Sequence, residues 1–280
     1  MKDLSRRFSF TVISIIILVF LLKYSFNSWF QYVVVGVVAV LTGIAIWEYE
    51  QFAKAKGGRM ILPFLMAMTM IEVVSFYLAA RYPFLQSLPL IIFFIGFVVL
   101  FALHFGEKDG ALVDLSVSSF GLLYIAVPMG MVLGILYFNG QDGRWWVAYL
   151  LAVTKITDIG AYFAGSLWGR RKLAPNISPG KTVEGALFGL VCAVFSSFAF
   201  HLMSDYTALA FHLGTVEWLC LGLVLGSIGQ FGDLSESLLK RDANKKDSNA
   251  LPGLGGVLDS IDSLLFNAPI LYIYLNYIKS

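Results

Sequence analysis

The chain has 280 residues, of which 58% are hydrophobic and 14% are charged, and its mean hydropathy is +0.78. Soluble globular domains are nearer half apolar and a quarter charged, so this composition excludes a disordered chain and argues against a water-soluble enzyme. The net charge of +2 is too small for a nucleic-acid-binding surface. The two cysteines cannot form a zinc site alone, and they do not indicate a disulfide framework.

The sequence contains nine apolar segments close to the roughly 20 residues that a transmembrane helix needs. In chain order they are Phe8–Leu22, Phe30–Trp47, Met60–Ala80, Phe84–Phe105, Leu112–Phe138, Trp146–Leu167, Gly185–Met203, Trp218–Leu239 and Leu258–Tyr277. The fifth is long enough to tilt or kink, and no small-residue cleavage site marks the first as a signal peptide. We therefore predict an all-α integral membrane protein, one polytopic domain over residues 1–280 with about nine transmembrane helices.

The distribution of Lys and Arg predicts the orientation of the chain, because cytoplasmic loops of membrane proteins are enriched in both residues. With the N-terminus in the cytoplasm, the inner segments hold 15 of the 20 basic residues and the outer segments hold 4. We therefore predict a cytoplasmic N-terminus. The two largest basic loops, Gly169–Thr182 and Lys240–Gly256, then lie on the cytoplasmic side beside helices that carry acidic residues.

Five acidic residues lie where the predicted helices should contact lipid: Asp158 in the sixth segment, Asp233 and Glu236 in the eighth, and Asp259 and Asp262 at the start of the ninth. An ionised Asp near the bilayer centre costs about 2.5–3.5 kcal/mol unless it is paired, hydrated or bound to a metal. Spacings of three residues place Asp233 with Glu236, and Asp259 with Asp262, on one helical face each. Oxygen ligands suit Mg²⁺, so we predict a polar cavity in which these carboxylates bind one or two cations. The alternative is that they form ion pairs at helix ends and reach toward water.

Two other charged residues lie within the predicted spans. Lys155 precedes Asp158 by three residues, and the spacing favours a pair between them. Glu72 stands alone in the third segment, so we interpret it as a structural or interfacial residue.

The first basic loop has residues suited to binding phosphate. Ser178-Pro-Gly-Lys-Thr182 resembles the end of a P-loop, but Pro175 stands where that motif requires glycine, and no strand is predicted before it. We therefore reject an ordinary P-loop. Ser178 and Thr182 still offer hydroxyls, Lys181 offers a point charge, and the free N–H groups of the next helix can face an anion.

The second basic loop combines positive charge with glycines. Lys240, Arg241 and Lys246 supply the charge, and Gly255 and Gly256 let the backbone approach a ligand closely. A topology signal beside anionic lipid would explain the basic residues. It would not explain glycines that lead directly into the two acidic residues of the ninth segment.

The stretch from Ser237 to Asp262 resembles the signature of the phosphatidate cytidylyltransferases, also called CDP-diacylglycerol synthases. The matching residues are Ser237, Lys240, Arg241, Lys246, Asp247, Gly255, Gly256, Asp259 and Asp262. The segments Asp158–Tyr162, Ser178–Gly185 and Gly232–Ser237 also resemble the family. The sequence departs from the family pattern at Leu254, where the family has His, at Ser260, where it has Arg, and in a spacer one residue shorter.

The resemblance implies an enzyme that transfers a cytidylyl group from CTP to phosphatidic acid, giving CDP-diacylglycerol and pyrophosphate for phospholipid synthesis. It implies catalytic roles for Asp233, Asp259, Asp262, Lys240 and Arg241. It implies substrate binding by Ser178, Lys181, Thr182, Ser237, Lys246, Gly255 and Gly256, and Mg²⁺ ligands, with a second cation, among Asp233, Asp259, Asp262, Asp158 and Glu236.

The same resemblance implies a homodimer in the cell membrane, with the active site facing the cytoplasm. Residues 1–140 would then form N-terminal helices that act as a scaffold, contribute to the dimer or face the lipid. Residues 145–280 would hold the catalytic helices and cytoplasmic loops.

Three alternatives remain open at this point. A CTP-dependent polyprenol or phytol kinase would share both kinds of substrate but release CDP instead of pyrophosphate. The departures at Leu254 and Ser260 are also compatible with a catalytically impaired homologue. A secondary transporter would need midplane charges in both halves, whereas here they concentrate in the C-terminal half.

Overall fold

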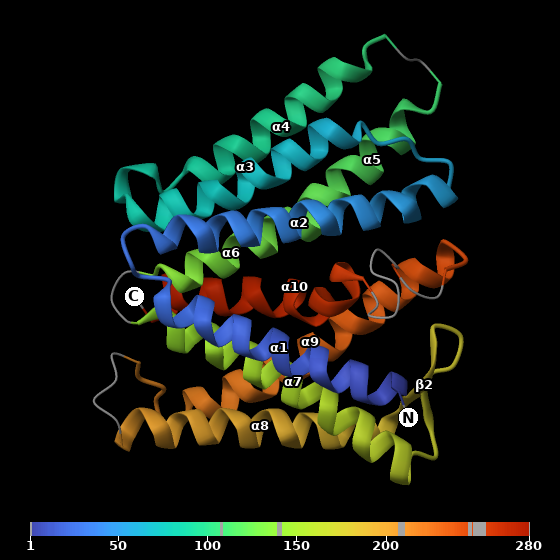
Figure 1. Cartoon of the computed structure of the whole chain (residues 1–280). Coiled ribbons are helices and arrows are strands. Elements are labelled where there is room, and N and C mark those ends of the chain that lie inside the picture. Colours follow the sequence, from blue (N-terminus) through green and yellow to red (C-terminus); the bar gives the residue numbers. More distant parts are fainter. Residues whose placement is uncertain are drawn as a thin grey trace.

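The computed structural model describes residues 2–106, 109–138, 142–206, 211–245, 248 and 256–279. The elements are α1 Lys2–Tyr24, α2 Phe30–Ala55, α3 Leu62–Arg81, η1 Pro83–Leu85, α4 Leu88–His104, α5 Ala111–Gly121, η2 Leu122–Ala126, α6 Val127–Leu136, α7 Gly143–Trp168, β1 Lys172–Ala174, β2 Ser178–Thr182, α8 Val183–Tyr206, α9 Glu217–Asp242, α10 Val257–Ile273 and η3 Tyr274–Ile278. Most of them are long helices that run side by side (Figure 1).

The helices confirm the predicted class of an all-α membrane protein. Within the described residues, seven helical stretches are long and apolar enough to cross a membrane, and Ile13–Tyr24 is a shorter apolar helix. Large apolar side chains also face outward, for example Leu90 and Phe94 of α4, which are 72% and 63% exposed. Such a surface is suited to lipid rather than to water. The predicted count of nine spans and the cytoplasmic N-terminus stay predictions.

The predicted fifth span contains an irregularity that its length suggested. α5 and α6 are joined end to end by the π-helical turn η2, so the whole stretch Ala111–Leu136 is continuous. Single π turns inside α-helices are frequent at functional sites. This turn carries Tyr124, which is buried in the protein.

The first basic loop forms a β-hairpin, which corrects the expectation that no strand accompanies the Ser178–Thr182 motif. β1 pairs with β2 in antiparallel fashion, with Lys172 opposite Thr182 and Ala174 opposite Ser178. The hairpin escaped sequence analysis because a strand of three residues has no alternation of polar and apolar side chains to detect. The P-loop is still excluded, since Pro175 occupies the position that requires glycine.

α10 holds the two halves of the chain together. It packs against α2 and α6 on one side and against α7 and α9 on the other (Figure 1). The N-terminal end of α10, the C-terminal end of α9 and the hairpin all lie at the same end of the molecule. This end therefore gathers the acidic and basic residues that the sequence singled out.

Candidate functional site

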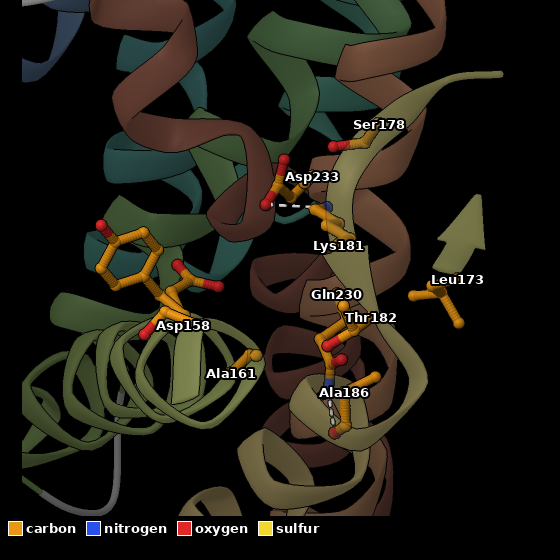
Figure 2. Close-up of a pocket in the computed structure, with 13 residues that line it drawn as sticks. Asp158, Ala161, Leu173, Ser178, Lys181, Thr182, Ala186, Gln230 and Asp233 are labelled. Carbon is orange, nitrogen blue, oxygen red and sulfur yellow. Dashed lines mark hydrogen bonds and ion pairs between the residues drawn. The ribbon is translucent and has the colours of Figure 1, made fainter. Parts of the chain in front are cut away.

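A cavity of about 320 Å³ opens between α7, the hairpin, α8 and α9 (Figure 2). Its lining consists of Asp158, Ala161, Tyr162, Gly165, Ser166, Leu173, Ser178, Gly180, Lys181, Thr182, Ala186, Gln230 and Asp233. The structure thus brings together five of the predicted site residues, namely Asp158, Ser178, Lys181, Thr182 and Asp233. These polar groups come from α7, the hairpin and α9.

An ion pair crosses the cavity between the hairpin and α9. Nζ of Lys181 lies 2.8 Å from Oδ2 of Asp233, and Figure 2 shows the two side chains pointing toward each other. The Lys181 side chain is 25% exposed and that of Asp233 is 34% exposed, but Nζ of Lys181 is itself buried, with Asp233 as its ion-pair partner. One turn earlier on α9, Nε2 of Gln230 donates a hydrogen bond to the Ala186 carbonyl at 3.2 Å and ties α9 to the start of α8.

Thr182 caps the N-terminus of α8. Its Oγ1 accepts a hydrogen bond from the Gly185 amide at 3.1 Å, the arrangement by which Thr satisfies a free N–H at the first turn of a helix. The side chain is enclosed by two glycines of the preceding segment. A Cβ on Gly165 would lie 3.0 Å from Thr182 Oγ1, and one on Gly169 would lie 2.6 Å from Thr182 Cγ2. The sequence predicted that Thr182 binds phosphate. In the structure its hydroxyl also caps α8.

A second charged cluster lies about two turns further along α9, around Lys240. Nζ of Lys240 forms ion pairs with Glu236 on the same helix and with Oδ1 of Asp259 on α10, the latter at 2.8 Å. The Glu236 side chain is completely buried, and those of Lys240 and Asp259 are 14% and 18% exposed. A buried carboxylate with a lysine partner avoids the large cost of an isolated buried charge.

Asp259 also caps the helix on which it lies. Its Oδ2 accepts hydrogen bonds from the backbone amides of Gly256 at 2.9 Å and Ser248 at 3.2 Å. Both oxygens are therefore engaged by groups of the protein. Gly256 is the N-cap residue of α10, so this predicted substrate-binding residue lies directly beside Asp259.

Asp262 lies in the second turn of α10, three residues after Asp259. It is 7% exposed and accepts a hydrogen bond from the Ser263 amide at 2.5 Å. Asp233 and Asp158 are close enough for their charges to act on it. Lys155 also acts on Asp158 and Asp262 electrostatically, while its Nζ donates a hydrogen bond to the Ser260 carbonyl at 2.9 Å.

The remaining predicted residues lie at the rim of the site or outside the described part of the chain. Nε of Arg241 donates to the Ile177 carbonyl at 3.1 Å and thereby links α9 to the turn of the hairpin. Ser237 is partly exposed on α9. Lys246 and Gly255 lie outside the residues that the structure describes. So does Leu254, one of the positions at which the sequence departs from the family pattern.

Sequence analysis missed Glu48, which lies beside this site on α2. Glu48 is 1% exposed and accepts hydrogen bonds from the Val257 and Leu258 amides at 2.8 and 2.7 Å. The predicted second span ends at Trp47, so Glu48 was placed just outside the membrane and drew no attention. The signal that could have found it is its position within an apolar helix that continues to Ala55.

Tyr124 is a second residue that sequence analysis missed. Its hydroxyl is buried without a hydrogen-bond partner among the described residues, and it lies within electrostatic reach of Glu236 and Asp262. Its ring stacks on Phe120, with the centroids 5.3 Å apart. A single tyrosine inside an apolar span matches no functional motif, so the sequence did not single it out. The π-helical turn that contains Tyr124 also could not be predicted from composition.

The acidic residues fit a cation that arrives together with phosphates rather than a complete protein cage. Across the described parts of the chain, no three His, Cys, Asp or Glu side chains gather closely enough to form a ready-made metal centre. Mg²⁺ usually takes only one or two carboxylates and completes its shell with water and substrate phosphates. Asp233, Asp262 and Asp158, whose charges act on one another, offer such carboxylates.

Comparisons with known proteins identify the family of the chain. A model of the Cytidylyltransferase family matches residues 5–278. The phosphatidate cytidylyltransferase of Chlamydia pneumoniae is 33% identical over 283 residues, which cover 96% of this chain and 91% of that protein. The enzyme of the same name from Haemophilus influenzae is 32% identical over 263 residues, covering 87% and 89% of the two chains. The one from Bacillus subtilis is 46% identical over 136 residues, which cover 48% of this chain and 49% of the relative.

Proposed function

The chain belongs to the cytidylyltransferase family, and from this membership we propose that it transfers a cytidylyl group from CTP to phosphatidic acid. The products are CDP-diacylglycerol and pyrophosphate, and the enzyme is a nucleotidyltransferase of phospholipid synthesis. The observation that carries the proposal is the match to named phosphatidate cytidylyltransferases along nearly the whole chain. The cavity that gathers Asp158, Ser178, Lys181, Thr182 and Asp233 supports it.

The reaction joins a phosphate oxygen of phosphatidic acid to the α-phosphorus of CTP and releases pyrophosphate from that phosphorus. The attacking oxygen is already anionic near neutral pH, so no general base is required. Transfer of this kind depends on alignment and on neutralising negative charge. The cavity offers one lysine, Lys181, together with Asp158 and Asp233, which could hold a cation.

Lys181 exchanges partners in our proposal. Before substrate binds, its ammonium group neutralises Asp233. A phosphate that enters the cavity attracts Lys181, with Ser178 beside it on the same strand. Asp233 would then be free to hold a cation that accompanies the nucleotide. Mg²⁺ bound there would neutralise charge on the phosphates and fix their geometry.

Besides the hairpin with Lys181 and Ser178, we propose a second phosphate-binding region around Lys240 and Asp259. Lys240 is held by Glu236 and Asp259 and points to the start of α10, and Arg241 lies beside the hairpin turn. We assign Lys240, Arg241, Ser237 and Gly256, together with the predicted residues Lys246 and Gly255, to binding of the triphosphate. Asp259 remains a predicted metal ligand, and Asp262 and Asp233 are the acidic residues that the geometry favours most.

The topology of the proposal has nine spans, a cytoplasmic N-terminus and an active site facing the cytoplasm. The excess of Lys and Arg in the inner segments supports it. The site lies at one end of the helices (Figure 1), where a lipid phosphate at the interface and a soluble nucleotide can both reach it. We also propose a homodimer. The apolar helices indicate a membrane protein, and the bacterial relatives imply the cell membrane.

The experiment that tests the function incubates purified protein with labelled CTP, phosphatidic acid and Mg²⁺ and identifies the products. CDP-diacylglycerol and pyrophosphate in equal amounts are expected. CDP together with a phosphorylated lipid would indicate the kinase. An absence of turnover under conditions in which a relative such as the B. subtilis enzyme is active would indicate an impaired homologue.

A further inference from the structure

Glu48 connects the N-terminal half of the chain to the first turn of α10. Its Oε1 accepts a hydrogen bond from the Val257 amide at 2.8 Å, and its Oε2 accepts one from the Leu258 amide at 2.7 Å. Oε2 also accepts one from the Ser248 hydroxyl at 3.1 Å. The side chain is 1% exposed, so these contacts replace the water that the carboxylate would otherwise have.

The contacts of Glu48 are those of a helix cap supplied by another helix. The first N–H groups of a helix have no partner within it, and a negative charge near them is favourable. Val257 and Leu258 are the first two residues of α10, and Glu48 satisfies both of their amides. The start of α10 is therefore fixed by α2 and not only by its own sequence.

Gly256 is shaped to this contact. A Cβ on Gly256 would lie 2.5 Å from Oε2 of Glu48 and would overlap the Ser248 hydroxyl. Neither neighbour is free to move away, since Glu48 holds two amides and Ser248 is bonded to both acidic residues. A glycine of the family signature is thus explained here by the passage of a carboxylate from α2, without reference to a ligand.

Asp259 also binds Ser248 and the residue before α10. Its Oδ2 accepts from the Ser248 and Gly256 amides, while its Oδ1 binds Lys240. Ser248 therefore gives its hydroxyl to Glu48 and its amide to Asp259. A shift of Glu48 would move Ser248 and the first turn of α10, and with them the position of Asp259.

We propose that Glu48 is a positioning residue of the active site: through Ser248 and the first turn of α10, it sets where Asp259 and Asp262 stand relative to Lys240 and the cavity. This inference rests on the proposed function, because the site that Glu48 orders is the one assigned to cytidylyl transfer. The N-terminal helices then contribute to the rate of the reaction and not only to anchoring.

The test compares Glu48→Gln with Glu50→Gln in the full-length protein. Gln keeps the size of Glu48 but loses one acceptor oxygen and the charge. Glu50 is a matched control, since it is also buried on α2, at 4% exposure, but pairs with Lys54 at 2.8 Å. We expect E48Q to lower kcat by about tenfold or more, as loss of one charged hydrogen bond would, with the KM for phosphatidic acid unchanged. E50Q should keep both constants.

A second measurement, made without substrate, tests the hydrogen bonds between Glu48 and α10 directly. Amide hydrogen exchange at Val257 and Leu258 should accelerate at least about tenfold in E48Q and in Ser248→Ala to a smaller extent, and not in E50Q. Unchanged exchange in E48Q would overturn the proposal, and so would an unchanged kcat in a variant whose exchange had increased. If the wild-type protein makes no CDP-diacylglycerol, the proposed function fails, while exchange still decides whether Glu48 holds α10.

Discussion

Nζ of Lys240, near the end of α9, lies 2.8 Å from Oδ1 of Asp259 in the first turn of α10 and also pairs with Glu236. One ammonium group therefore balances two carboxylates, one of them fully buried. Removing the positive charge leaves negative charges facing each other in a space with little water. Breaking a buried pair in this way costs about 3–5 kcal/mol, and the partial exposure of Lys240 places its cost toward the low end of that range.

We predict that Lys240→Met lowers both stability and activity. Thermal unfolding in detergent should show a lower Tm, and product formation should fall at least about a hundredfold. The double variant Lys240→Met with Glu236→Gln should recover part of the Tm, because it no longer buries an uncompensated carboxylate, but none of the activity. A Tm for K240M equal to that of the wild type would show that the pair does not stabilise the helix contact.

Asp233→Asn should separate activity from stability. The Lys181–Asp233 pair is a quarter to a third exposed, and such pairs contribute only about 0–1 kcal/mol. We expect near-normal Tm but at least about a hundredfold loss of product, with a higher Mg²⁺ concentration needed for half-maximal rate. Asp242→Asn is the control, since Asp242 lies on the same helix in an exposed pair with Lys56. Normal turnover by D233N would show that the carboxylate of Asp233 is not needed for the reaction.

Asp259→Ala should abolish CTP-dependent product formation while the protein stays in the membrane. The variant also frees the Gly256 and Ser248 amides, so we expect a stability loss of about 1–2 kcal/mol, the usual effect of losing a helix cap. Asp262→Asn keeps an acceptor oxygen for the Ser263 amide and removes the charge, so it should lose activity with a smaller change in Tm. Product formation by D259A at the wild-type rate would contradict the assigned role.

Lys155 is expected to supply a positive charge where Ser260 replaces the arginine of the family pattern. Its Nζ binds the Ser260 carbonyl, so Lys155→Met should lower the rate about tenfold or more. Ser260→Arg should change the wild-type rate little and should restore part of the activity of K155M. Full activity of K155M would contradict the assignment. A large gain from S260R alone would show instead that the departure impairs this chain.

The sequence predicted the family and the helices that carry the acidic residues better than it predicted how those helices meet. Spacings of three and four residues correctly placed Asp233 with Glu236 and Asp259 with Asp262 on helices, and the resemblance to the family is confirmed by the comparisons. Periodicity within one helix says nothing about which helices meet. It therefore did not reveal that Asp233 faces the hairpin while Asp259 faces Lys240.

Long-range contacts account for what the sequence did not show. Glu48 reaches α10 across 209 residues of chain, and no local pattern encodes such a contact. The hairpin was missed because its two strands, of three and five residues, are too short to show an alternation of polar and apolar side chains. The expected pair of Lys155 with Asp158 follows helical spacing, whereas in the fold Lys155 reaches to the backbone of α10.

The bond between Glu48 and Val257 also sets an order of events during biosynthesis. Glu48 leaves the ribosome early, and its partners on α10 emerge only after the other helices of the site have been made. Until α10 has been made, Glu48 therefore has neither of the amide partners that it holds in the finished fold. The first turn of α10 can take its place only once both the N-terminal and the C-terminal helices are present.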